Sequence, residues 1–357
     1  MDETVTVGIV GLGTHGANHA RLLREMGHEV FGVDADPTAR ERFEQRFDRP
    51  AYESPDDLFG RDVDAVVIST PNRFHEPSAL GALEAGLDVL LEKPLAHDLE
   101  SAERIAEAAE RTGNVCMVGF HHRYRDVCRV ARSYVESGYL GEITHIDAKY
   151  VRRRGVPGRG TWYTSEDIAG GGALLDTGAH CLDMLLYLSG WPELDSVSAA
   201  VDSYFGHRDD YAYLEMWGED DQTKMYDVED TVTAFCEFEG GLTATVEVAW
   251  AANDEGSHSY RIKGTDAGAK LDVTNSLDAV EPVPDQRNDL TLYEVRQGGR
   301  DHFVDSTVHV RPNDPYTDEL ETFVDAVVTG ERPSLTNVHE ALDVQRVIDR
   351  IYDAQTG

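Results

Sequence analysis

The sequence predicts an α/β protein with two domains: a doubly wound parallel sheet, followed by an α+β domain whose sheet is mostly antiparallel. Three observations support this prediction. The 357 residues exceed what one ordinary hydrophobic core accommodates. Up to about residue 141, apolar runs of strand length alternate with segments of helical period, which is typical of a parallel sheet. Beyond it, strand-like segments alternate apolar and polar residues, as in half-solvated antiparallel sheets. We place the domains at residues 1–122 and 123–357.

In the N-terminal part, each predicted strand is followed by a predicted helix. The strands are almost continuously apolar, as expected for a sheet covered on both faces. They occupy residues 4–10, 28–35, 64–70, 88–94 and 115–122. The helices carry apolar residues at helical spacing. They occupy residues 17–27, 36–47, 71–86, 98–113 and 125–138.

The C-terminal part contains strands that read as one antiparallel sheet. They occupy residues 142–151, 195–203, 230–238, 242–252 and 290–295. The stretch EFEGGLT at residues 237–243 predicts a hairpin turn between two of them. Two closing segments, 315–329 and 337–353, have helical period, and we expect them to pack back against the first domain.

The charge of the chain is strongly negative. There are 67 acidic residues against 32 basic ones, a formal net charge of −35. Lysine is scarce and arginine dominates among the basic residues; the lysines are Lys93, Lys149, Lys224, Lys263 and Lys270. Self-repulsion of this size is relieved in molar salt, so the composition favours a protein of a halophilic archaeon; the alternative is an acidic surface without special meaning. The same charge argues against nucleic acid and anionic membranes as partners.

Other features of composition predict an intracellular, cytoplasmic protein. The chain begins with the acidic, strand-like segment MDETVTV, unlike the basic start of a secretory signal peptide, and no apolar run approaches 18 residues. The cysteines form no C-x-x-C pair and lie in apolar or helical contexts, so we expect reduced, buried thiols and no zinc cluster. They are Cys116, Cys128, Cys181 and Cys236.

A glycine-rich turn follows the first predicted strand. Gly11, Gly13 and Gly16 form G-x-G-x-x-G, and Asp34 ends the second strand, where the ribose of a dinucleotide would be held. These glycines let the backbone approach a pyrophosphate at the N-terminus of the following helix. A carboxylate suits the ribose diol and repels a 2′-phosphate, so NAD is favoured. Arg40 lies close enough in sequence to reach such a phosphate, which keeps NADP as an alternative. The alternative interpretation is that the glycine turn has a purely structural role and binds no nucleotide.

Two more strand ends supply candidate ligand-binding residues. STPNRFH follows the third apolar strand of the series and EKP the fourth, at the edge where ligands bind in open α/β sheets. Pro94 disfavours a helical backbone at Lys93. The lysine is therefore expected to extend into the crevice. A solvated strand-end lysine is the alternative, but the scarcity of lysine in this chain favours a site role.

The stretch GGGALLDTGAH, residues 170–180, places an acid and an imidazole after three glycines. If the segment after Gly172 is helical, Asp176 and His180 stand on one face, one turn apart. The pair is a candidate site. Taken alone, it is equally consistent with two helix residues that satisfy each other.

Several separated motifs, in this order, resemble the Gfo/Idh/MocA family of NAD(P)-dependent oxidoreductases (glucose-fructose oxidoreductase and inositol dehydrogenase among them). The motifs are GLGTHGANH, STPNRFH, EKP, VGFHHRY, GRGTW, GGGALLDTGAHCLD, VEDT and ERPSLTNVHEALDV, and they span nearly the whole chain. In FHHRY, His121 and His122 stand where relatives often have asparagine or methionine before the arginine.

The resemblance implies a Rossmann domain, a second domain with a large open sheet, an active site in the cleft between them, and a homodimer or homotetramer assembled through the open sheet. It assigns catalysis to Lys93, Asp176 and His180, and lets the three glycines bring the chain close to the cofactor. The expected cofactor-binding residues are Gly11, Leu12, Gly13, Thr14, His15, Gly16, Asp34, Thr70, Pro71, Asn72, His75, Glu92, Lys93 and Trp162. The expected substrate-binding residues are Lys93, His122, Arg123, Arg152, Trp162, Asp176 and His180.

These side chains suit the oxidation of a sugar, a cyclitol or another polyhydroxy compound. His180 can accept the hydroxyl proton while hydride passes to the nicotinamide. Asp176 can orient the imidazole, and Lys93 can hydrogen-bond the developing alkoxide. Asp183 is a candidate support, although a solvated helix acid is the favoured reading.

Two further readings concern ligands. Asp176, His180 and Asp183 could form a mixed metal-ligand set, but Lys93 already supplies the positive charge that a metal would bring, so no metal is expected. The run VRRRGVPGRGTW places four arginines ahead of Trp162, and one or two of them could hold an anionic group of the substrate. Solvated side chains on an edge strand and loop are favoured for these arginines: Arg152, Arg153, Arg154 and Arg159.

Two rival functions remain at this point. The first is a glycosidase that uses tightly held NAD transiently, which would release a reducing sugar without net NADH. The second is a non-catalytic regulator that senses nucleotide or sugar on the same fold. The joint presence of Lys93 and His180 weighs against the regulator.

Overall fold

The computed structural model describes residues 4–210, 218–221, 223–224, 226–274 and 289–355. The chain divides into two compact units. Unit 1 comprises residues 1–121 and 315–345, and unit 2 comprises residues 122–314 and 346–357. No described helix combines the length and the apolar character needed to cross a membrane.

Unit 1 contains a six-stranded sheet in which every neighbouring pair is parallel, in the order β3-β2-β1-β4-β5-β6. This order reverses direction between β1 and β4, which is the switch point where dinucleotides bind in such sheets. The strands are β1 (Thr6–Val10), β2 (Glu29–Val33), β3 (Ala51–Tyr52), β4 (Ala65–Ile68), β5 (Asp88–Leu91) and β6 (Cys116–Val118). All four residues of β4 are buried, as the apolar runs predict.

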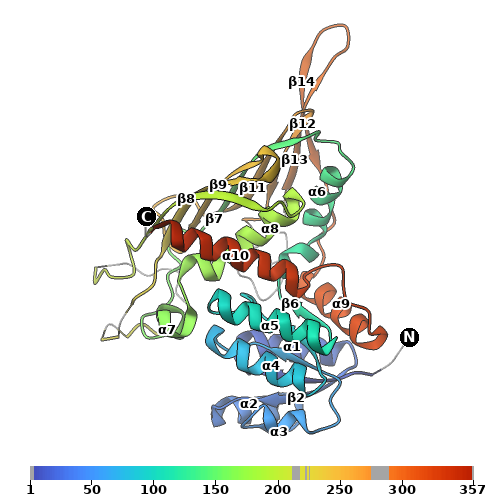
Figure 1. Cartoon of the computed structure of the whole chain (residues 1–357), viewed down its shortest axis with the longest axis vertical. Helices are drawn as coiled ribbons and strands as arrows, with labels where there is room; N and C mark the ends of the chain where they lie inside the picture. The colour runs from blue at the N-terminus through green and yellow to red at the C-terminus, as the bar shows by residue number, and fades with distance from the viewer. Residues whose placement is uncertain (1–3, 211–217, 222, 225, 275–288, 356–357) are drawn as a thin grey trace. The chain divides into compact units, whose positions relative to one another are not determined.

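The helices of unit 1 alternate with its strands (Figure 1). They are α1 (Thr14–Glu25), α2 (Pro37–Phe47), α3 (Asp56–Phe59), α4 (His75–Glu84), α5 (Leu99–Thr112) and α9 (Pro315–Thr329), with a 3₁₀ turn η1 (Asn72–Phe74). α4 and α5 lie side by side, and α9 packs on α1. The last helix, α10 (Val338–Gln355), begins in unit 1 and ends in unit 2.

Unit 2 contains an eight-stranded sheet in the order β14-β13-β12-β11-β7-β10-β9-β8. Its neighbours are antiparallel except β7 and β10, which run parallel. The strands are β7 (Ile143–Val151), β8 (Leu194–Asp202), β9 (Thr231–Phe238), β10 (Thr243–Ala249), β11 (Ser257–Gly264), β12 (Ala267–Asp272), β13 (Asp289–Arg296) and β14 (His302–Val308). The predicted hairpin at 237–243 joins β9 to β10, which are antiparallel.

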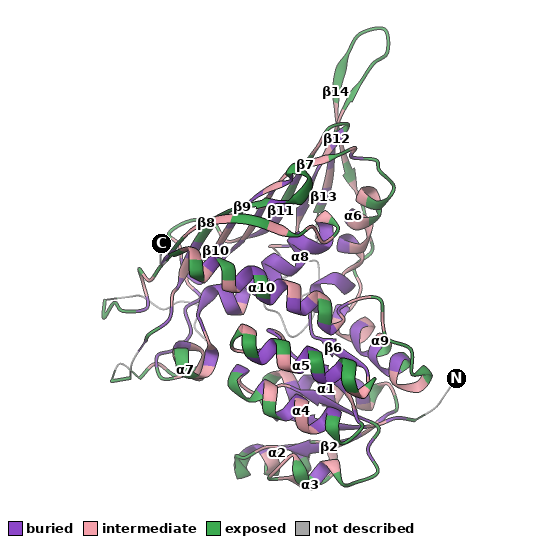
Figure 2. Ribbon diagram, in the orientation of Figure 1, coloured by how far each residue is buried: buried purple, intermediate pink, exposed green. Residues whose placement is uncertain are grey.

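Helices cover one face of this sheet, and no described helix covers the other, which we call the open face (Figure 2). α8 (Ala179–Ser189) packs on β7 and β10, and α6 (Asp126–Glu136) packs on β12 and β13. Along β9, buried residues alternate with more exposed ones, which is the pattern of a one-sided sheet. Shorter elements complete the unit: the 3₁₀ turns η2 (His121–Tyr124), η3 (Trp162–Thr164) and η5 (Glu239–Gly241), the helix α7 (Glu166–Ala169) and the π-helical turn η4 (Leu174–Gly178).

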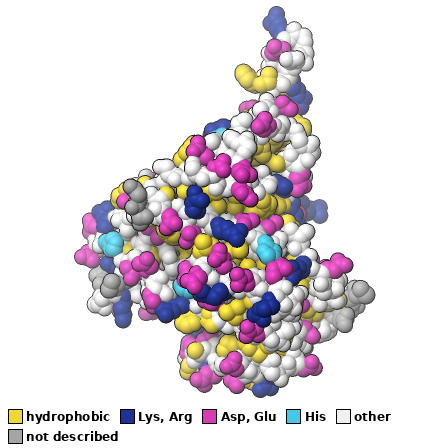
Figure 3. Space-filling view, in the orientation of Figure 1, with side chains coloured by type: hydrophobic (Ala, Val, Ile, Leu, Met, Phe, Trp, Pro, Cys, Tyr) yellow, Lys and Arg dark blue, Asp and Glu magenta, His cyan; other side chains and the backbone are white. Residues whose placement is uncertain are grey.

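Three strands of unit 2 were not predicted, and each has a physical reason. β11 places polar His258 and Ser259 in buried positions, β12 is rich in glycine and alanine, and β14 is mostly exposed. β11 and β14 show no clean alternation of apolar and polar residues, and in β12 the alternating buried positions are mostly small alanines. The acidic residues are spread over the face of the molecule shown in Figure 3 and do not form one patch.

Candidate active site

The glycine turn of unit 1 is sterically constrained at two of its three glycines. Gly11 has φ +94°, and a Cβ there would lie 2.7 Å from the Ser69 carbonyl oxygen. A Cβ on Gly16 would lie 1.9 Å from the Gly11 carbonyl oxygen. Gly13 differs, because a Cβ there would meet nothing within 4 Å, and no described side chain caps α1 at this residue. Open space at the start of a helix, where the first N–H groups have no partner within the helix, fits the pyrophosphate of a dinucleotide.

Asp34 holds the turn together. Its Oδ2 accepts a hydrogen bond from the Leu12 N–H at 2.8 Å, and its Oδ1 accepts one from the Asp36 N–H at 2.8 Å. Arg40 lies beside it, but its Nη1 donates to the backbone oxygens of Asp34 (2.7 Å) and Ala35 (3.0 Å). The carboxylate thus reinforces the turn, and the guanidinium is held by main-chain carbonyls.

The loop after β4 carries Thr70, Pro71, Asn72 and His75. His75 is buried, with Nδ1 2.9 Å from the Pro94 carbonyl oxygen and Nε2 2.9 Å from the Thr70 carbonyl oxygen. Burial lowers the pKa of His75, although these carbonyls oppose the shift. Thr70 Oγ1 is buried and has no hydrogen-bond partner among the described residues. His75 therefore ties the loop after β4 to the EKP loop, next to a hydroxyl that a polar ligand could satisfy.

The EKP loop follows β5 and begins with a buried acid. Glu92 Oε1 lies 2.7 Å from His19 Nε2 and 3.9 Å from His15 Nδ1. Burial opposes ionisation of Glu92, but the hydrogen bond with His19 and the nearby histidines hold the pKa of its carboxyl well below the usual range. Lys93 comes next, and the Lys93–Pro94 peptide bond is cis. Glu92 thus links α1 to the end of β5. His19, which was not on the predicted site list, is its partner.

In unit 2, Asp176 lies in the π-helical turn η4, directly before α8 with His180. π-Helical turns are frequent at functional sites. Trp250 Nε1 donates to Asp176 Oδ2 at 2.9 Å, and Arg152 Nη1 lies 3.7 Å from the same oxygen. His180 is buried with 5% exposure. The predicted helix is therefore present, and Trp250 is a partner of Asp176 that the sequence did not reveal.

A second imidazole lies against His180. The rings of His122 and His180 meet edge to face with centroids 4.5 Å apart, and His258 contacts His122 in the same way at 4.9 Å. Arg125 Nε donates to His122 Nδ1 at 3.0 Å, which places the His122 proton on Nε2 when the ring is neutral. Burial lowers the pKa of His258 to about 3, with help from Arg125 and Arg152.

Asp183 was expected as a solvated helix acid, and that expectation is wrong. Its side chain is fully buried in an ion pair with Arg123, which is also fully buried. Both carboxylate oxygens accept hydrogen bonds from Arg123 Nε, at 3.0 and 2.9 Å. α8 turns this side of the helix to the interior, where an acid requires a cation. Asp183 is thus committed to Arg123, and Arg123 has no exposed surface in this structure for a substrate.

The arginines before Trp162 were expected to be solvated, and this is wrong for two of them. Arg152 is 9% exposed and lies near Asp176. Arg159 is 5% exposed, and its guanidinium donates to Asp220 at 2.9 and 3.0 Å. Arg153 is exposed, and Arg154 donates to Asn253 Oδ1 at 2.6 Å. Trp162 is half-buried and stacks on Tyr163 with ring centroids 3.8 Å apart.

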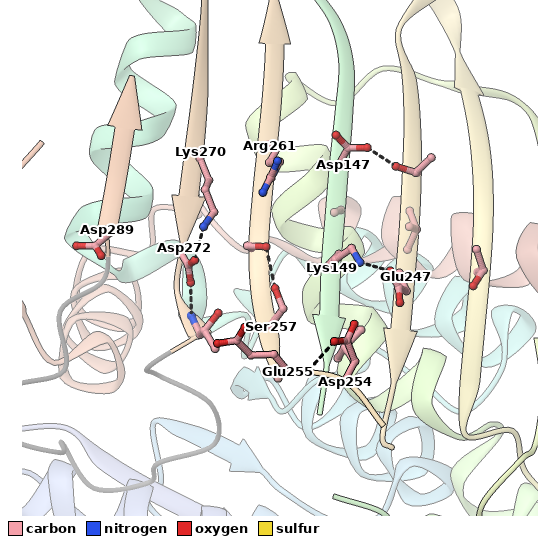
Figure 4. Close-up of a pocket in the computed structure, with 18 residues that line it drawn as sticks. Asp147, Lys149, Glu247, Asp254, Glu255, Ser257, Arg261, Lys270, Asp272 and Asp289 are labelled. Carbon is pink, nitrogen blue, oxygen red and sulfur yellow. Dashed lines mark hydrogen bonds and ion pairs between the residues drawn. The ribbon is translucent and has the colours of Figure 1, made fainter. Parts of the chain in front are cut away.

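A polar pocket of about 650 Å³ lies on the open face of the unit 2 sheet (Figure 4). None of the predicted site residues lines it. Its rim carries an ion pair between the neighbouring strands β7 and β10, Lys149 with Glu247, and one within β12, Lys270 with Asp272 at 2.8 Å. Asp147 lines the pocket. Burial raises the pKa of its carboxyl, but hydrogen bonds from Lys263, Thr245 and His145 outweigh burial and lower this pKa to about 2.

Comparison with known proteins covers both units. A model described as "Oxidoreductase family, NAD-binding Rossmann fold" matches residues 5–120, and one described as "GFO/IDH/MocA C-terminal domain" matches residues 128–270. The chain is 31% identical over 297 residues to the D-glucoside 3-dehydrogenase of Escherichia coli (strain K12), which covers 82% of this chain and 78% of that protein. It is 26% identical over 355 residues to the scyllo-inositol 2-dehydrogenase (NAD(+)) of Bacillus subtilis (strain 168), covering 97% and 92%.

Solved structures show the same fold. A levoglucosan dehydrogenase in complex with NADH and levoglucosan superposes with a TM-score of 0.80 at 23% identity, covering 99% of this chain and 98% of that one. At this identity the likeness concerns the fold.

Proposed function

The chain belongs to the Gfo/Idh/MocA family of oxidoreductases with an NAD-binding Rossmann domain, and from this premise we propose that it is a dehydrogenase of a sugar, a cyclitol or a related polyhydroxy compound. Relatives named for a glucoside and for an inositol support this substrate class. The observation that carries the proposal is the start of α8, where Trp250 holds the Asp176 carboxylate one turn before the buried imidazole of His180.

In this proposal the residues of the chain move one proton and stabilise one charge. When bound, the nicotinamide accepts a hydride from the carbinol carbon or returns it. His180 accepts the hydroxyl proton of the substrate, because an imidazole titrates near neutral pH. Asp176 orients His180 and favours its charged form. Lys93 donates a hydrogen bond to the oxygen on which negative charge develops.

We assign the cofactor contacts to unit 1, with Trp162 of unit 2 as the one exception among the proposed contacts. The turn from Gly11 to Gly16 holds the pyrophosphate, and Asp34 holds the adenosine ribose. The same carboxylate opposes a 2′-phosphate, which favours NAD over NADP. The remaining proposed cofactor contacts are Leu12, Thr14, His15, Thr70, Pro71, Asn72, His75, Glu92, Lys93 and Trp162. For the substrate we retain Lys93, His122, Arg152, Trp162, Asp176 and His180.

The experiment is a panel of sugars, polyols and sugar acids, assayed with NAD and then NADP in high KCl. The formation of reduced nicotinamide is followed by its absorbance. At least one polyhydroxy compound should give sustained turnover with one equivalent of reduced cofactor per product. Release of a reducing sugar without net NADH would contradict the proposal and identify a glycosidase. Cofactor binding without turnover on any member of the panel would favour a sensor.

We further propose that the protein works at high salt in the cytoplasm and assembles as a dimer or tetramer through the open face of the unit 2 sheet. Three of the five lysines lie on this sheet, each beside an acid: Lys149, Lys263 and Lys270. These ion pairs reduce the repulsion between two copies that a net charge of −35 otherwise imposes. Light scattering in 2 M KCl measures the mass of the assembly.

A further inference from the structure

Glu229 lies two residues before the start of β9 and is not among the predicted site residues. Its Oε2 accepts a hydrogen bond from the Gly172 N–H at 2.8 Å, and its Oε1 accepts one from the Leu174 N–H at 2.8 Å. The Ala173 N–H donates to its backbone oxygen at 3.1 Å. Three successive N–H groups at the start of a helical segment thus have one residue as their acceptor. Such groups have no partner within the helix itself.

Tyr352, in α10, completes this arrangement within unit 2. Its hydroxyl donates to Glu229 Oε1 at 3.0 Å. Burial and the neighbouring carboxylate raise the pKa of Tyr352, so the hydroxyl keeps its proton and stays a donor. Burial also raises the pKa of Glu229, while the N–H groups of Leu174 and Gly172 and the Tyr352 hydroxyl oppose that rise.

The glycines of the G-G-G run fit around these two residues. A Cβ on Gly172 would lie 1.9 Å from the Glu229 carbonyl oxygen, and a Cβ on Gly171 would lie 2.1 Å from the Tyr352 hydroxyl. Real Cβ atoms do not approach other atoms so closely. Packing within unit 2 therefore explains the glycines of this run, because only glycine lets the chain pass so close to Glu229 and Tyr352.

The same strand end also positions Asp176. The Asp176 N–H donates to the Gly172 carbonyl oxygen at 3.0 Å, so the Asp176 backbone follows the loop that Glu229 holds. The backbone oxygen of Asp230, the next residue, accepts a hydrogen bond from the backbone N–H of Trp250 at 2.9 Å. The indole N–H of Trp250 in turn donates to the Asp176 carboxylate. Two adjacent residues thus determine where the helix begins and where its acid lies.

We propose that Glu229 is a positioning residue for the reaction: its carboxylate, fixed by the Tyr352 hydroxyl, holds the start of the helical segment so that Asp176 and His180 keep their catalytic placement. The inference rests on the proposed function of those two residues. It concerns a group that touches neither substrate nor cofactor, and it predicts a loss of turnover without a loss of cofactor binding.

The test compares Glu229→Gln with Tyr352→Phe. A glutamine keeps one acceptor oxygen but turns its NH₂ toward a second N–H donor, so the loop must shift. A displacement of about 1 Å in a catalytic group can cost about 100-fold in rate, and we expect Glu229→Gln to lower kcat by about 10- to 100-fold. Tyr352→Phe leaves both N–H bonds intact and should cost about 2- to 5-fold. The Kd for NAD should stay within about 2-fold for both variants, because the proposed pyrophosphate and ribose contacts of NAD lie in unit 1.

Two matched controls carry the same chemical changes elsewhere in unit 2. Glu239→Gln changes an exposed acid at the other end of β9. Tyr139→Phe removes another tyrosine hydroxyl that donates to a glutamate, here Glu294 at 2.6 Å on the surface. Both controls should keep wild-type kcat. Hydrogen exchange of the Gly172 and Leu174 amides should accelerate in Glu229→Gln and not in Glu239→Gln.

The double variant Glu229→Gln/His180→Ala separates positioning from a general loss of stability. If Glu229 acts through the helix start, Glu229→Gln should cost much less in the His180→Ala background than in the wild type. Equal costs in both backgrounds, or wild-type kcat in Glu229→Gln, would overturn the inference while the proposed function stands. Wild-type kcat in His180→Ala would instead overturn the proposed function, and the positioning role would fall with it.

Discussion

Arg123 and Asp183 face each other in the interior of unit 2, and neither side chain has any exposed surface. Removing one partner of a buried ion pair leaves an uncompensated charge, at a cost of about 3–5 kcal/mol. We expect Asp183→Leu to lose about that much in the free energy of unfolding. The double variant Arg123→Met/Asp183→Leu should lose less, because it buries no lone charge. Urea unfolding in molar KCl measures both. A double variant less stable than Asp183→Leu would contradict this account of the pair.

The role of His180 predicts a kinetic phenotype. His180→Ala should lower kcat by about 10²- to 10⁴-fold, the usual contribution of a positioned general base. The Kd for NAD should stay nearly constant, since the glycine turn and Asp34 belong to unit 1. In the wild type, kcat/KM for oxidation should rise with pH through one ionisation and then level off, because the base must be neutral. If His180→Ala keeps that pH profile, the proton acceptor is another group, and Lys93→Ala becomes the next variant.

The choice of cofactor depends on Asp34. We expect NAD to bind at least about tenfold tighter than NADP, a difference of about 1.4 kcal/mol. Asp34→Ser should reduce the difference in affinity between NAD and NADP, because it removes the charge that repels a 2′-phosphate. It also removes the acceptor of the Leu12 N–H, so NAD itself should bind more weakly. Fluorescence titration with both reduced cofactors measures the four constants. Equal affinities in the wild type would refute the preference.

His258 makes stability depend on pH. Burial lowers its pKa in the folded protein to about 3, against 6.5 for the free side chain. Between these values the unfolded chain binds a proton that the folded protein excludes, so stability falls as the pH drops below 6.5 toward 3. His258→Gln removes this pH-dependent contribution to the free energy of unfolding. Between pH 7 and 4.5, the wild type should lose about 2 kcal/mol more than the variant. Parallel stability curves, measured by urea unfolding at constant KCl, would exclude this role.

The charge of −35 predicts a response to salt. The melting temperature should climb as KCl rises from tens of millimolar to molar, because the Debye length shrinks to about 3 Å and repulsion between carboxylates is screened. Differential scanning calorimetry over this range provides the measurement. A melting temperature that stays flat or falls over this range would show that the acidic surface does not adapt the protein to high salt.

Much of the fold could be predicted because its signals are local. The apolar runs and glycine turns of unit 1 indicate a parallel sheet, and the structure confirms it. The parallel pairing of β7 with β10 could not be predicted, since nothing within either strand encodes a partner about 100 residues away. β11 escaped prediction because His258 and Ser259 occupy buried positions that normally hold apolar residues.

The surroundings of the candidate site were harder to predict than its residue types. Spacing along the sequence placed Asp176 and His180 in one helical segment. Their supporting side chains come from distant parts of the chain: Trp250 contacts Asp176, and Glu229 with Tyr352 holds the loop before it. Contacts of this kind are set by packing, which single-sequence patterns do not report. The VEDT motif, which contains Glu229, was the one available signal.

The discontinuity of unit 1 affects how the protein is made. Its last strand, β6, is covered by the segment around Thr336, whose carbonyl oxygen accepts a hydrogen bond from the Val118 N–H at 2.8 Å, and α9 packs on α1. Both of these elements follow residues 122–314 in the chain. At a synthesis rate of about 5–20 residues per second, the ribosome needs roughly 10–40 s to add that stretch. During this time the nascent N-terminal segment carries an uncovered β edge, and a chain stalled before residue 315 cannot close it.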